Sequence, residues 1–208
     1  MLTYEKDLWT RGTTLIAGVD EVGRGCLFGD VVAAAVVLPV GCETDLLPGV
    51  DDSKKLTEKQ REALLPSIAE RAVAVGIGRV DAETVDAINI RQASRLAMKK
   101  AVRALGVTPD HLLVDAETVD VDVPQTAIIH GDALSLSIAA ASIVAKVTRD
   151  RLCREWDALY PEYGIAGHKG YATKLHRERL LMFGASPMHR QSFLGKLFAA
   201  QLEQLELF

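Results

Sequence analysis

The sequence contains few cysteines and no long apolar run, and both absences narrow the classes of protein to which it can belong. Its three cysteines, Cys26, Cys42 and Cys153, are odd in number and lack the paired spacing of a zinc site, which favours a reducing cytoplasm. No apolar run approaches the roughly 18 residues of a membrane-spanning helix, and the first residues lack the pattern of a secretion signal. We therefore expect a cytoplasmic protein without a membrane partner.

Positive charge is also scarce. The net charge of −4 argues against nucleic-acid binding through overall charge, because such binding needs clustered positive charge. The C-terminal third is an exception, since five basic residues and one acid lie between His168 and Arg190. This segment could form one side of a groove, although a solvated helix face explains it equally well.

The chain has no internal repeat, low-complexity tract or long linker. Its 208 residues, 49% hydrophobic and 25% charged, are typical of a globular protein with one main domain. We expect that domain over residues 1–160 and a C-terminal helical lobe over residues 161–208, in a monomer.

Strands and helices alternate along the sequence in a way that favours an α/β fold. Apolar runs predict a strand from Leu15 and further strands over 31–38, 72–80, 111–117 and 126–132. Caps and helical spacing predict helices over 57–71, 81–105 and 136–160, a short helix from Thr173 and a last one from Gln191. This order indicates a mixed β-sheet flanked by helices, followed by the helical lobe.

Two acidic side chains, Asp20 and Glu21, end the first apolar run, and a tight turn at residues 23–25 is expected to lead into the second strand. Adjacent carboxylates at the end of a buried strand repel each other, so a cation or hydrogen-bond donors must compensate. Asp115 and Asp132 end two further apolar runs in the same way.

These four carboxylates would form a cluster if their strands end at one edge of the sheet. Oxygen ligands without histidine or cysteine suit Mg²⁺ or Mn²⁺ rather than zinc. Carboxylate-held metal pairs serve the in-line attack of water on a phosphodiester. A single aspartate at a strand end is more often a turn or helix cap, and the sequence does not show that the four acids meet.

Five motifs occur in a fixed order and together resemble ribonuclease HII, the bacterial type 2 ribonuclease H. They are spread over roughly residues 15–193 and read GVDEVGRGCLFGDVVAAAVVL, DDSKKL, LLVDAE, GDALSLSIAAASIVAKVTRD and YPEYGIAGHKGYATKLH. The resemblance implies a ribonuclease H-like fold and a metal-dependent endonuclease. Its substrates would be RNA/DNA hybrids and single ribonucleotides embedded in duplex DNA, cut on the 5′ side to leave a 3′-hydroxyl and a 5′-phosphate.

The resemblance also assigns roles to particular residues. Asp20, Glu21, Asp115 and Asp132 would be the catalytic ligands of Mg²⁺ or Mn²⁺, with two ions per site when substrate is bound. Gly23, Arg24 and Gly25 would sense the ribose 2′-hydroxyl, which alone separates RNA from DNA there. Without the neighbouring acids, such a turn would be read as an ordinary glycine-rich hairpin.

Further substrate contacts follow from the same resemblance. Tyr171 would pack on the sugar beside the ribonucleotide, although a tyrosine in such a loop is more often a surface anchor. Ser53 and Lys54 would contact phosphate, and Lys146 and Arg149 lie in a motif of the same family; a solvated or ion-paired side chain explains the basic residues equally well. The chain departs from the family at Cys26 and Asp30, where prolines are frequent, and at Ala116, where glycine is common.

The last five residues, QLELF, resemble the peptide with which bacterial repair proteins bind the sliding clamp. Gln204, Leu205, Leu207 and Phe208 would supply the contacts, since apolar anchors on a terminal peptide suit an apolar groove. The alternative is that these side chains pack back on the protein.

Two other functions compete with the leading interpretation. Ribonuclease HIII is similar but carries an extra N-terminal domain, whereas about 14 residues precede the first strand here. A non-catalytic nucleic-acid binder would gain nothing from four acids that face phosphates. Both are therefore weaker explanations than ribonuclease HII.

Overall fold

The computed structural model describes residues 1–51 and 53–195, so the predicted clamp-binding residues Gln204, Leu205, Leu207 and Phe208 lie outside the described part. At its centre is a sheet of five strands in the order β3-β2-β1-β4-β5. The strands are β1 (Ile16–Val22), β2 (Val31–Val37), β3 (Ala74–Val80), β4 (His111–Asp115) and β5 (Gln125–Ile128). β1 pairs antiparallel with β2 and parallel with β4. The predicted mixed sheet is confirmed.

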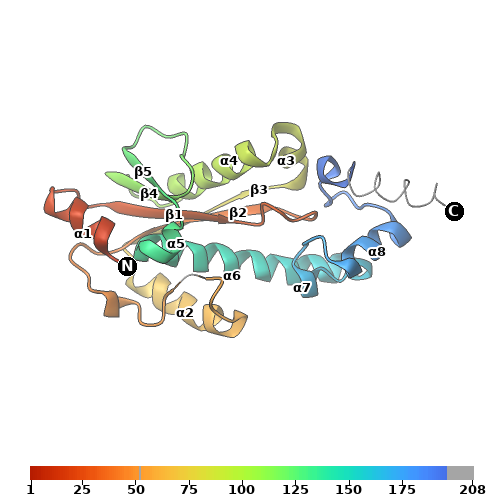
Figure 1. The fold of residues 1–208 in the computed structure, drawn as a ribbon, viewed down its shortest axis with the longest axis horizontal. Coiled ribbons are helices and arrows are strands. Elements are labelled where there is room, and N and C mark those ends of the chain that lie inside the picture. Colours follow the sequence, from red (N-terminus) through yellow and green to blue (C-terminus); the bar gives the residue numbers. More distant parts are fainter. Residues whose placement is uncertain (52, 196–208) are drawn as a thin grey trace.

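Helices cover both faces of the sheet (Figure 1). One face carries α3 (Ala82–Ile88) and α4 (Ile90–Arg103), and the other carries α2 (Glu58–Arg71) and α6 (Leu136–Leu159). The alternation along β2 sets this arrangement, because Ala33 and Ala35 lie in the core under α4 whereas Ala34 and Val36 lie in the core under α6. Shorter helices complete the described chain, namely α1 (Thr3–Thr10), α5 (Gly131–Leu134), α7 (Ile165–His168) and α8 (Lys174–Phe183), with 3-10 turns at Thr44–Leu46 and Pro161–Tyr163. None of the helices in the described residues is long and apolar enough to span a membrane.

Helix α6 lies directly on strand β1 at Gly18. A Cβ atom at this position would lie 2.1 Å from the backbone carbon of Ser137. Gly76 and Gly78 on β3 meet the backbone of α4 in the same way, with carbonyl oxygens 2.1 Å from each added Cβ. The missing side chains thus let both helix layers approach the sheet closely.

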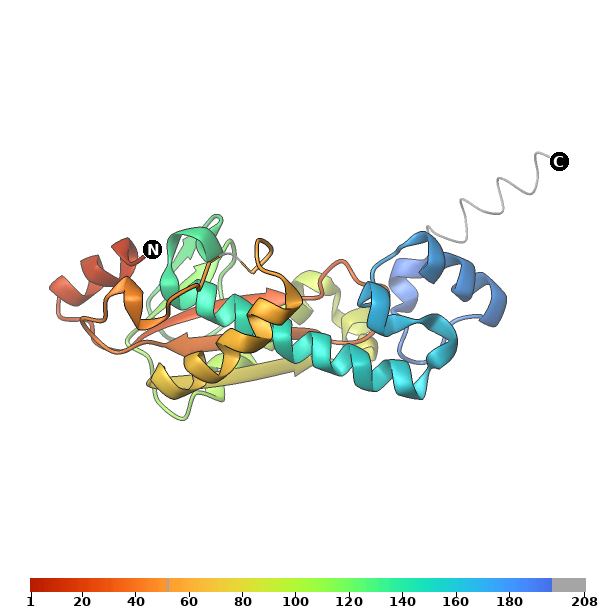
Figure 2. The same ribbon diagram turned by 90° about the horizontal axis from the view of Figure 1, so that it is seen from below.

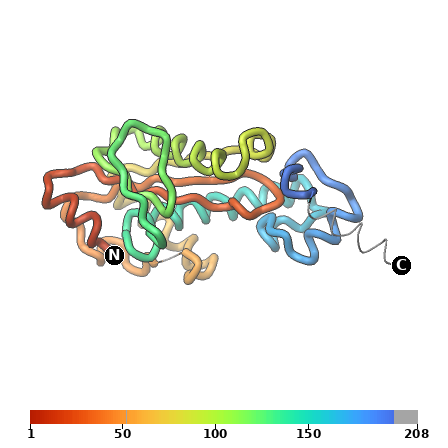
Figure 3. Tube along the Cα trace, turned by 45° about the horizontal axis from the view of Figure 1, so that its top comes forward, coloured from red at the N-terminus to blue at the C-terminus, as the bar shows by residue number. Residues whose placement is uncertain are grey.

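A small helical lobe follows α6 and lies at its far end (Figure 2). Figure 3 shows the loop between β1 and β2 reaching this lobe at the end of the sheet. Backbone hydrogen bonds join the two, from Leu27 N to Gly170 O (2.8 Å), from Gly29 N to Met188 O (2.9 Å) and from Arg190 N to Leu27 O (2.8 Å). The lobe is therefore attached to the loop that carries the Gly-Arg-Gly sequence.

Three predictions about local structure were wrong. The helix expected over 81–105 breaks at Asn89, which has a left-handed backbone (φ 67°) and caps α4 by accepting hydrogen bonds from Arg91 N and Gln92 N. The connection between β1 and β2 is longer than a tight turn, because the turn expected at residues 23–25 forms, with Cys26 N donating to Gly23 O (3.4 Å), but a loop continues to residue 30. Asp132 does not end a strand, because β5 stops at Ile128 and Asp132 lies in α5.

Two buried histidines within the lobe connect the loop that carries Tyr171 to the segment around Ser186. His189 Nδ1 accepts a hydrogen bond from Ser186 N (3.0 Å), so its Nε2 is the donor towards His176 Nε2 (3.1 Å). His176 Nδ1 in turn donates to the carbonyl of Tyr171 (2.9 Å). This chain of hydrogen bonds requires both rings to be neutral.

We expect this pair to make the protein less stable in mild acid. Burial lowers the pKa of His176 to about 4 and that of His189 to about 3. As the pH falls below about 6.5, the unfolded chain takes up these protons before the folded protein does, so the free energy of unfolding falls by up to about 1.4 kcal/mol per pH unit for each ring. Denaturant unfolding of His189→Gln between pH 7 and pH 5 should show a flatter dependence than wild type. His130→Asn, at an exposed histidine, is the control, and an equal flattening there would contradict the prediction.

Candidate active site

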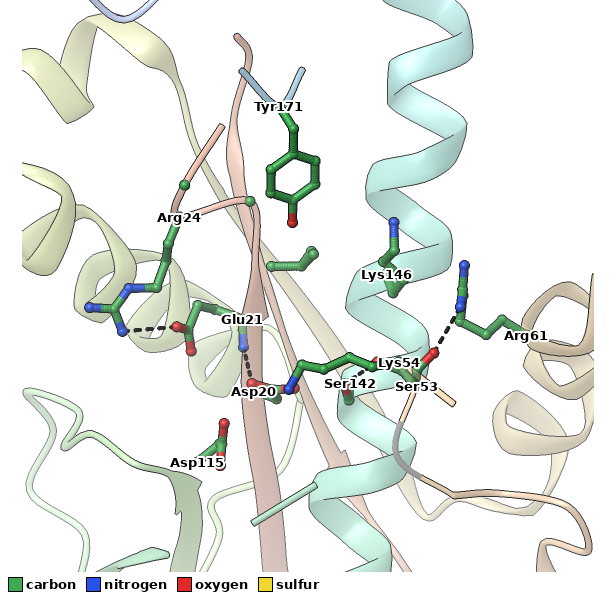
Figure 4. A pocket seen from close by; sticks show the side chains of 13 residues that line it. Asp20, Glu21, Arg24, Ser53, Lys54, Arg61, Asp115, Ser142, Lys146 and Tyr171 are labelled. Carbon is green, nitrogen blue, oxygen red and sulfur yellow. Dashed lines mark hydrogen bonds and ion pairs between the residues drawn. The ribbon is translucent and has the colours of Figure 1, made fainter. Parts of the chain in front are cut away.

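Three of the four predicted acids line one pocket at the end of the sheet (Figure 4). Asp20 and Asp115 come together because β1 and β4 are parallel neighbours with Val19 opposite Val114, and each aspartate is the next residue. Glu21 follows on β1. The pocket is also lined by the Gly-Arg-Gly turn and by residues from β1, α2, α6 and two loops, namely Val22, Ser53, Lys54, Arg61, Ser142, Lys146 and Tyr171.

The electrostatics of this pocket disfavour three negative charges. Burial raises the pKa of Asp20 well above its usual value, and the charges of Glu21 and Asp115 raise it further. Burial also raises the pKa of Glu21, although Arg24 at 3.1 Å opposes this shift. Burial raises the pKa of Asp115 too, against the hydrogen bond that Gly131 N donates to it (2.7 Å). A bound cation would relieve all three shifts.

The residues present fit a divalent metal ion in their chemistry. All are hard oxygen donors, and Glu21 Oε2 is a buried oxygen without a hydrogen-bond partner among the described residues. They are not preassembled as a cage, since no group of three acids, histidines or cysteines in residues 1–51 and 53–195 is arranged to hold an ion. The carboxylates would therefore need to come closer together to hold an ion.

Asp132 approaches the same site from α5. Its side chain is buried, and its Oδ2 accepts a hydrogen bond from Lys54 Nζ (2.9 Å). The charge of Asp132 also contributes to the raised pKa of Asp115, so the two carboxylates are near neighbours. The fourth predicted acid therefore lies beside the pocket, with an ammonium group against it.

The two glycines of the Gly-Arg-Gly turn are required for different structural reasons. Gly23 has a left-handed backbone (φ 93°), and a Cβ there would lie 2.3 Å from Arg149 Nε. Gly25 instead faces the ring of Tyr171, whose Cε1 would be in van der Waals contact with an added Cβ at 4.0 Å. Because glycine has no side chain, Gly25 and Tyr171 border a narrow gap in the lining of the pocket. The tyrosine hydroxyl is directed towards the carboxylates (Figure 4).

Two residues that the sequence did not single out hold the Ser53 loop against the site. Ser142 hydrogen-bonds to Asp20, and its hydroxyl lies 2.8 Å from that of Ser53. Arg61 donates to the carbonyl of Ser53 (2.8 Å). Ser142 sits among alanines in α6 and Arg61 in a charged helix, so neither position carries a signal that would have revealed it. Lys146 also lines the pocket and is paired with Asp150.

Arg149 was expected to contact the substrate, and this prediction was wrong. The side chain is fully buried, and it donates to the carbonyls of Phe28 (3.0 Å), Asp30 (3.0 Å) and Lys169 (2.8 Å). A guanidinium surrounded in this way cannot reach a phosphate on the surface.

The departures from the family have local explanations. Asp30 is paired with Arg79 (2.8 Å), so it adds little negative charge beside the site. Cys26 is buried, with its sulfur 3.4 Å from the carbonyl of Lys169. Ala116 has a left-handed backbone (φ 50°), where glycine would be unstrained.

Comparisons with known proteins agree with this geometry. The family model described as Ribonuclease HII matches residues 17–196. Ribonuclease HII of Alkaliphilus metalliredigens (strain QYMF) is 59% identical over 202 residues, covering 94% of this chain and 98% of that protein. The crystal structure of the ribonuclease H2 from Pyrococcus horikoshii OT3 is similar, with a TM-score of 0.73, 27% identity, and coverage of 85% of this chain and 92% of that one.

A second solved structure is the PCNA:RNase HII complex from Archaeoglobus fulgidus. It gives a TM-score of 0.72 and 27% identity, covering 86% of this chain and 93% of that chain. Family model, relative and fold all point to the same enzyme type, which uses divalent metal ions. The chain belongs to the ribonuclease HII family and is an endoribonuclease of the ribonuclease H type.

Proposed function

We propose that this endonuclease cuts the phosphodiester on the 5′ side of a ribonucleotide, in RNA/DNA hybrids and at single ribonucleotides embedded in duplex DNA, and so serves ribonucleotide removal and repair in the cytoplasm. The observation that carries the proposal is the pocket in which Asp20, Glu21 and Asp115 lie with Gly25 and Tyr171. Chemistry and sugar recognition would then share one cavity. The products would carry a 3′-hydroxyl and a 5′-phosphate.

The four carboxylates would hold two Mg²⁺ or Mn²⁺ ions, and such ions would supply the activation of water and the stabilisation of the leaving oxygen. Asp20, Glu21 and Asp115 have the raised pKa values of a site that needs a cation. Lys54 forms an ion pair with Asp132. When substrate binds, its ammonium group would leave Asp132 and contact a substrate phosphate instead. Ser53 and Lys146 line the same pocket and would contact the backbone on either side.

Recognition of the ribonucleotide would fall to the gap between Gly25 and Tyr171. Gly25 has no side chain, so a sugar could approach the backbone there, where main-chain groups would meet a 2′-hydroxyl. Tyr171 is partly exposed and its ring borders the gap, so it can pack on the next sugar. Arg24 at the centre of the turn is held by Glu21.

A DNA duplex with one ribonucleotide tests the proposal. Wild type with Mg²⁺ or Mn²⁺ should cut it on the 5′ side, and Tyr171→Ala should lower kcat/KM about tenfold or more through the loss of sugar stacking. Tyr4→Ala, at a partly exposed tyrosine of α1, is the matched control. An uncut ribonucleotide duplex would overturn the proposal, and unchanged cutting by Tyr171→Ala would remove Tyr171 from it.

We also propose that the C-terminal peptide QLELF binds the sliding clamp. Support comes from its sequence and from the Archaeoglobus fulgidus relative, which was solved in complex with PCNA. Leu207→Ala with Phe208→Ala should abolish clamp binding in calorimetry and leave cutting of free duplex unchanged, because the apolar anchors are lost. Glu206→Ala keeps every anchor and is the control. Clamp binding that survives the double substitution would refute this proposal.

A further inference from the structure

Two buried arginines lie beneath the loop of residues 23–30. Arg149 comes from α6 and Arg190 from the C-terminal lobe, and both side chains are fully buried. Arg190 donates to the carbonyl of Gly29 through Nε (3.0 Å) and Nη2 (2.8 Å), and to the carbonyl of Arg24 through Nη1 (3.0 Å). Arg149 donates to the carbonyls of Phe28 and Asp30 in the same loop. Together, the two guanidinium groups bind main-chain carbonyls at four positions of this one loop, namely 24, 28, 29 and 30.

Neither arginine has an ion pair with a carboxylate among the residues that the structure describes. Burying a cation without such a partner is unfavourable, and burial lowers the pKa of Arg190 to about 10. Carbonyl oxygens are the direct hydrogen-bond partners of both guanidinium groups, and Arg190 also lies over the ring of Phe193. An apolar side chain would fill these positions with a smaller desolvation penalty. We therefore expect the arginines to be there because they hold the loop in place, not because they stabilise the hydrophobic core.

The arginines also fix the loop relative to Tyr171. Arg149 packs against Gly23 and donates to the carbonyl of Lys169, two residues before Tyr171. A Cβ at Gly170 would lie 2.9 Å from the carbonyl of Phe28 and 3.4 Å from Arg149 Nη2. The segment 169–171 and the loop 23–30 therefore meet around one guanidinium.

We propose that Arg149 and Arg190 are positioning residues that set the width of the gap between Gly25 and Tyr171, and with it the preference for a single ribonucleotide. This inference rests on the proposed role of that gap in sugar recognition. The arginines touch no substrate themselves and act through the carbonyls of the loop. Lysine cannot replace them, because one ammonium nitrogen cannot span carbonyls that lie in different directions.

The test compares two substrates for Arg149→Lys and Arg190→Lys. We expect kcat/KM for a duplex with one ribonucleotide to fall at least tenfold further than kcat/KM for a continuous RNA/DNA hybrid, in which neighbouring ribonucleotides offer alternative registers. Mn²⁺ binding, measured by calorimetry, should stay unchanged, because the carboxylates lie on β1, β4 and α5. Arg71→Lys is the matched control, since Arg71 also donates to a carbonyl, that of Leu46, but lies in α2 away from the pocket.

Chemical rescue separates positioning from stability. Ethylguanidinium added to Arg190→Ala should restore the preference for the single ribonucleotide. Equal losses on both substrates in the lysine variants, with no rescue of the alanine variant, would show that the arginines only stabilise the fold and would overturn the inference. Failure of the proposed function would look different, because wild type would then cut neither substrate or Tyr171→Ala would have no effect.

Discussion

Asp20→Asn is expected to lower cleavage about 1000-fold or more and, in the absence of metal, to stabilise the protein. The first effect follows because a metal ion stabilises the transition state by several kcal/mol, and this stabilisation is reduced when one of its ligands is removed. Each 1.36 kcal/mol of lost stabilisation lowers the rate tenfold. The second follows because burial and two neighbouring carboxylates raise the pKa of Asp20. A carboxylate whose pKa is raised by folding lowers the free energy of unfolding at neutral pH, because its charge is less favourable in the folded protein than in the unfolded chain. Asparagine carries no charge and avoids this loss of stability.

Two measurements check this pair of effects. Cleavage of the ribonucleotide duplex should be lost, while the Tm of the metal-free protein should rise by about 2–4 °C per kcal/mol gained. The rise of Tm on adding Mn²⁺ should shrink, since one ligand is gone. Asp30→Asn is the control, because Asp30 is equally buried but paired with Arg79; it should lose stability and keep activity. Full activity of Asp20→Asn would refute the assignment of Asp20.

Gly18→Ala is expected to lower the free energy of unfolding by roughly 3 kcal/mol or more. The added methyl group would lie 2.1 Å from the backbone of Ser137, and neither β1 nor α6 can yield without breaking core contacts. Because Asp20 lies two residues further along β1, the folded fraction should also cut more slowly.

Alanine substitutions at two other glycines separate the loss of stability from the loss of cleavage activity. Gly76→Ala clashes equally with the backbone of α4 on the opposite face, so it should cost similar stability and leave cutting per folded molecule closer to wild type. Gly167→Ala meets no atom within 4 Å and lies in α7, so it should be neutral or slightly stabilising. Denaturant unfolding gives the stability of each variant. A Gly18→Ala protein as stable as wild type would contradict the packing argument.

Much of the fold was predictable because it depends on local pattern. Apolar runs marked all five strands of the described sheet, and Thr57 and Asp81 cap α2 and α3 as predicted. The sequence placed Asp20 and Asp115 at strand ends but left open whether they meet, and the parallel pairing of β1 with β4 brings them together.

What could not be predicted depends on tertiary context. The break at Asn89 interrupts a helical pattern that is continuous in sequence, and only the left-handed backbone reveals it. Asp132 looked like a strand end because Ile128 and Ile129 precede it, yet it lies in the first turn of α5. Arg149 looked like a surface cation, because a sequence cannot show that carbonyls of two distant loops will surround a guanidinium.

The attachment of the lobe to the loop between β1 and β2 has a consequence for proteolysis. The acidic residues of the site lie on β1, β4 and α5, whereas Arg190, which holds the carbonyl of Arg24, comes from the lobe. A cut in the lobe before Arg190 would leave every carboxylate in place but could release one of the two guanidinium groups that hold the loop. The cleaved protein would then keep the acidic residues while losing part of what restricts which phosphodiester they reach.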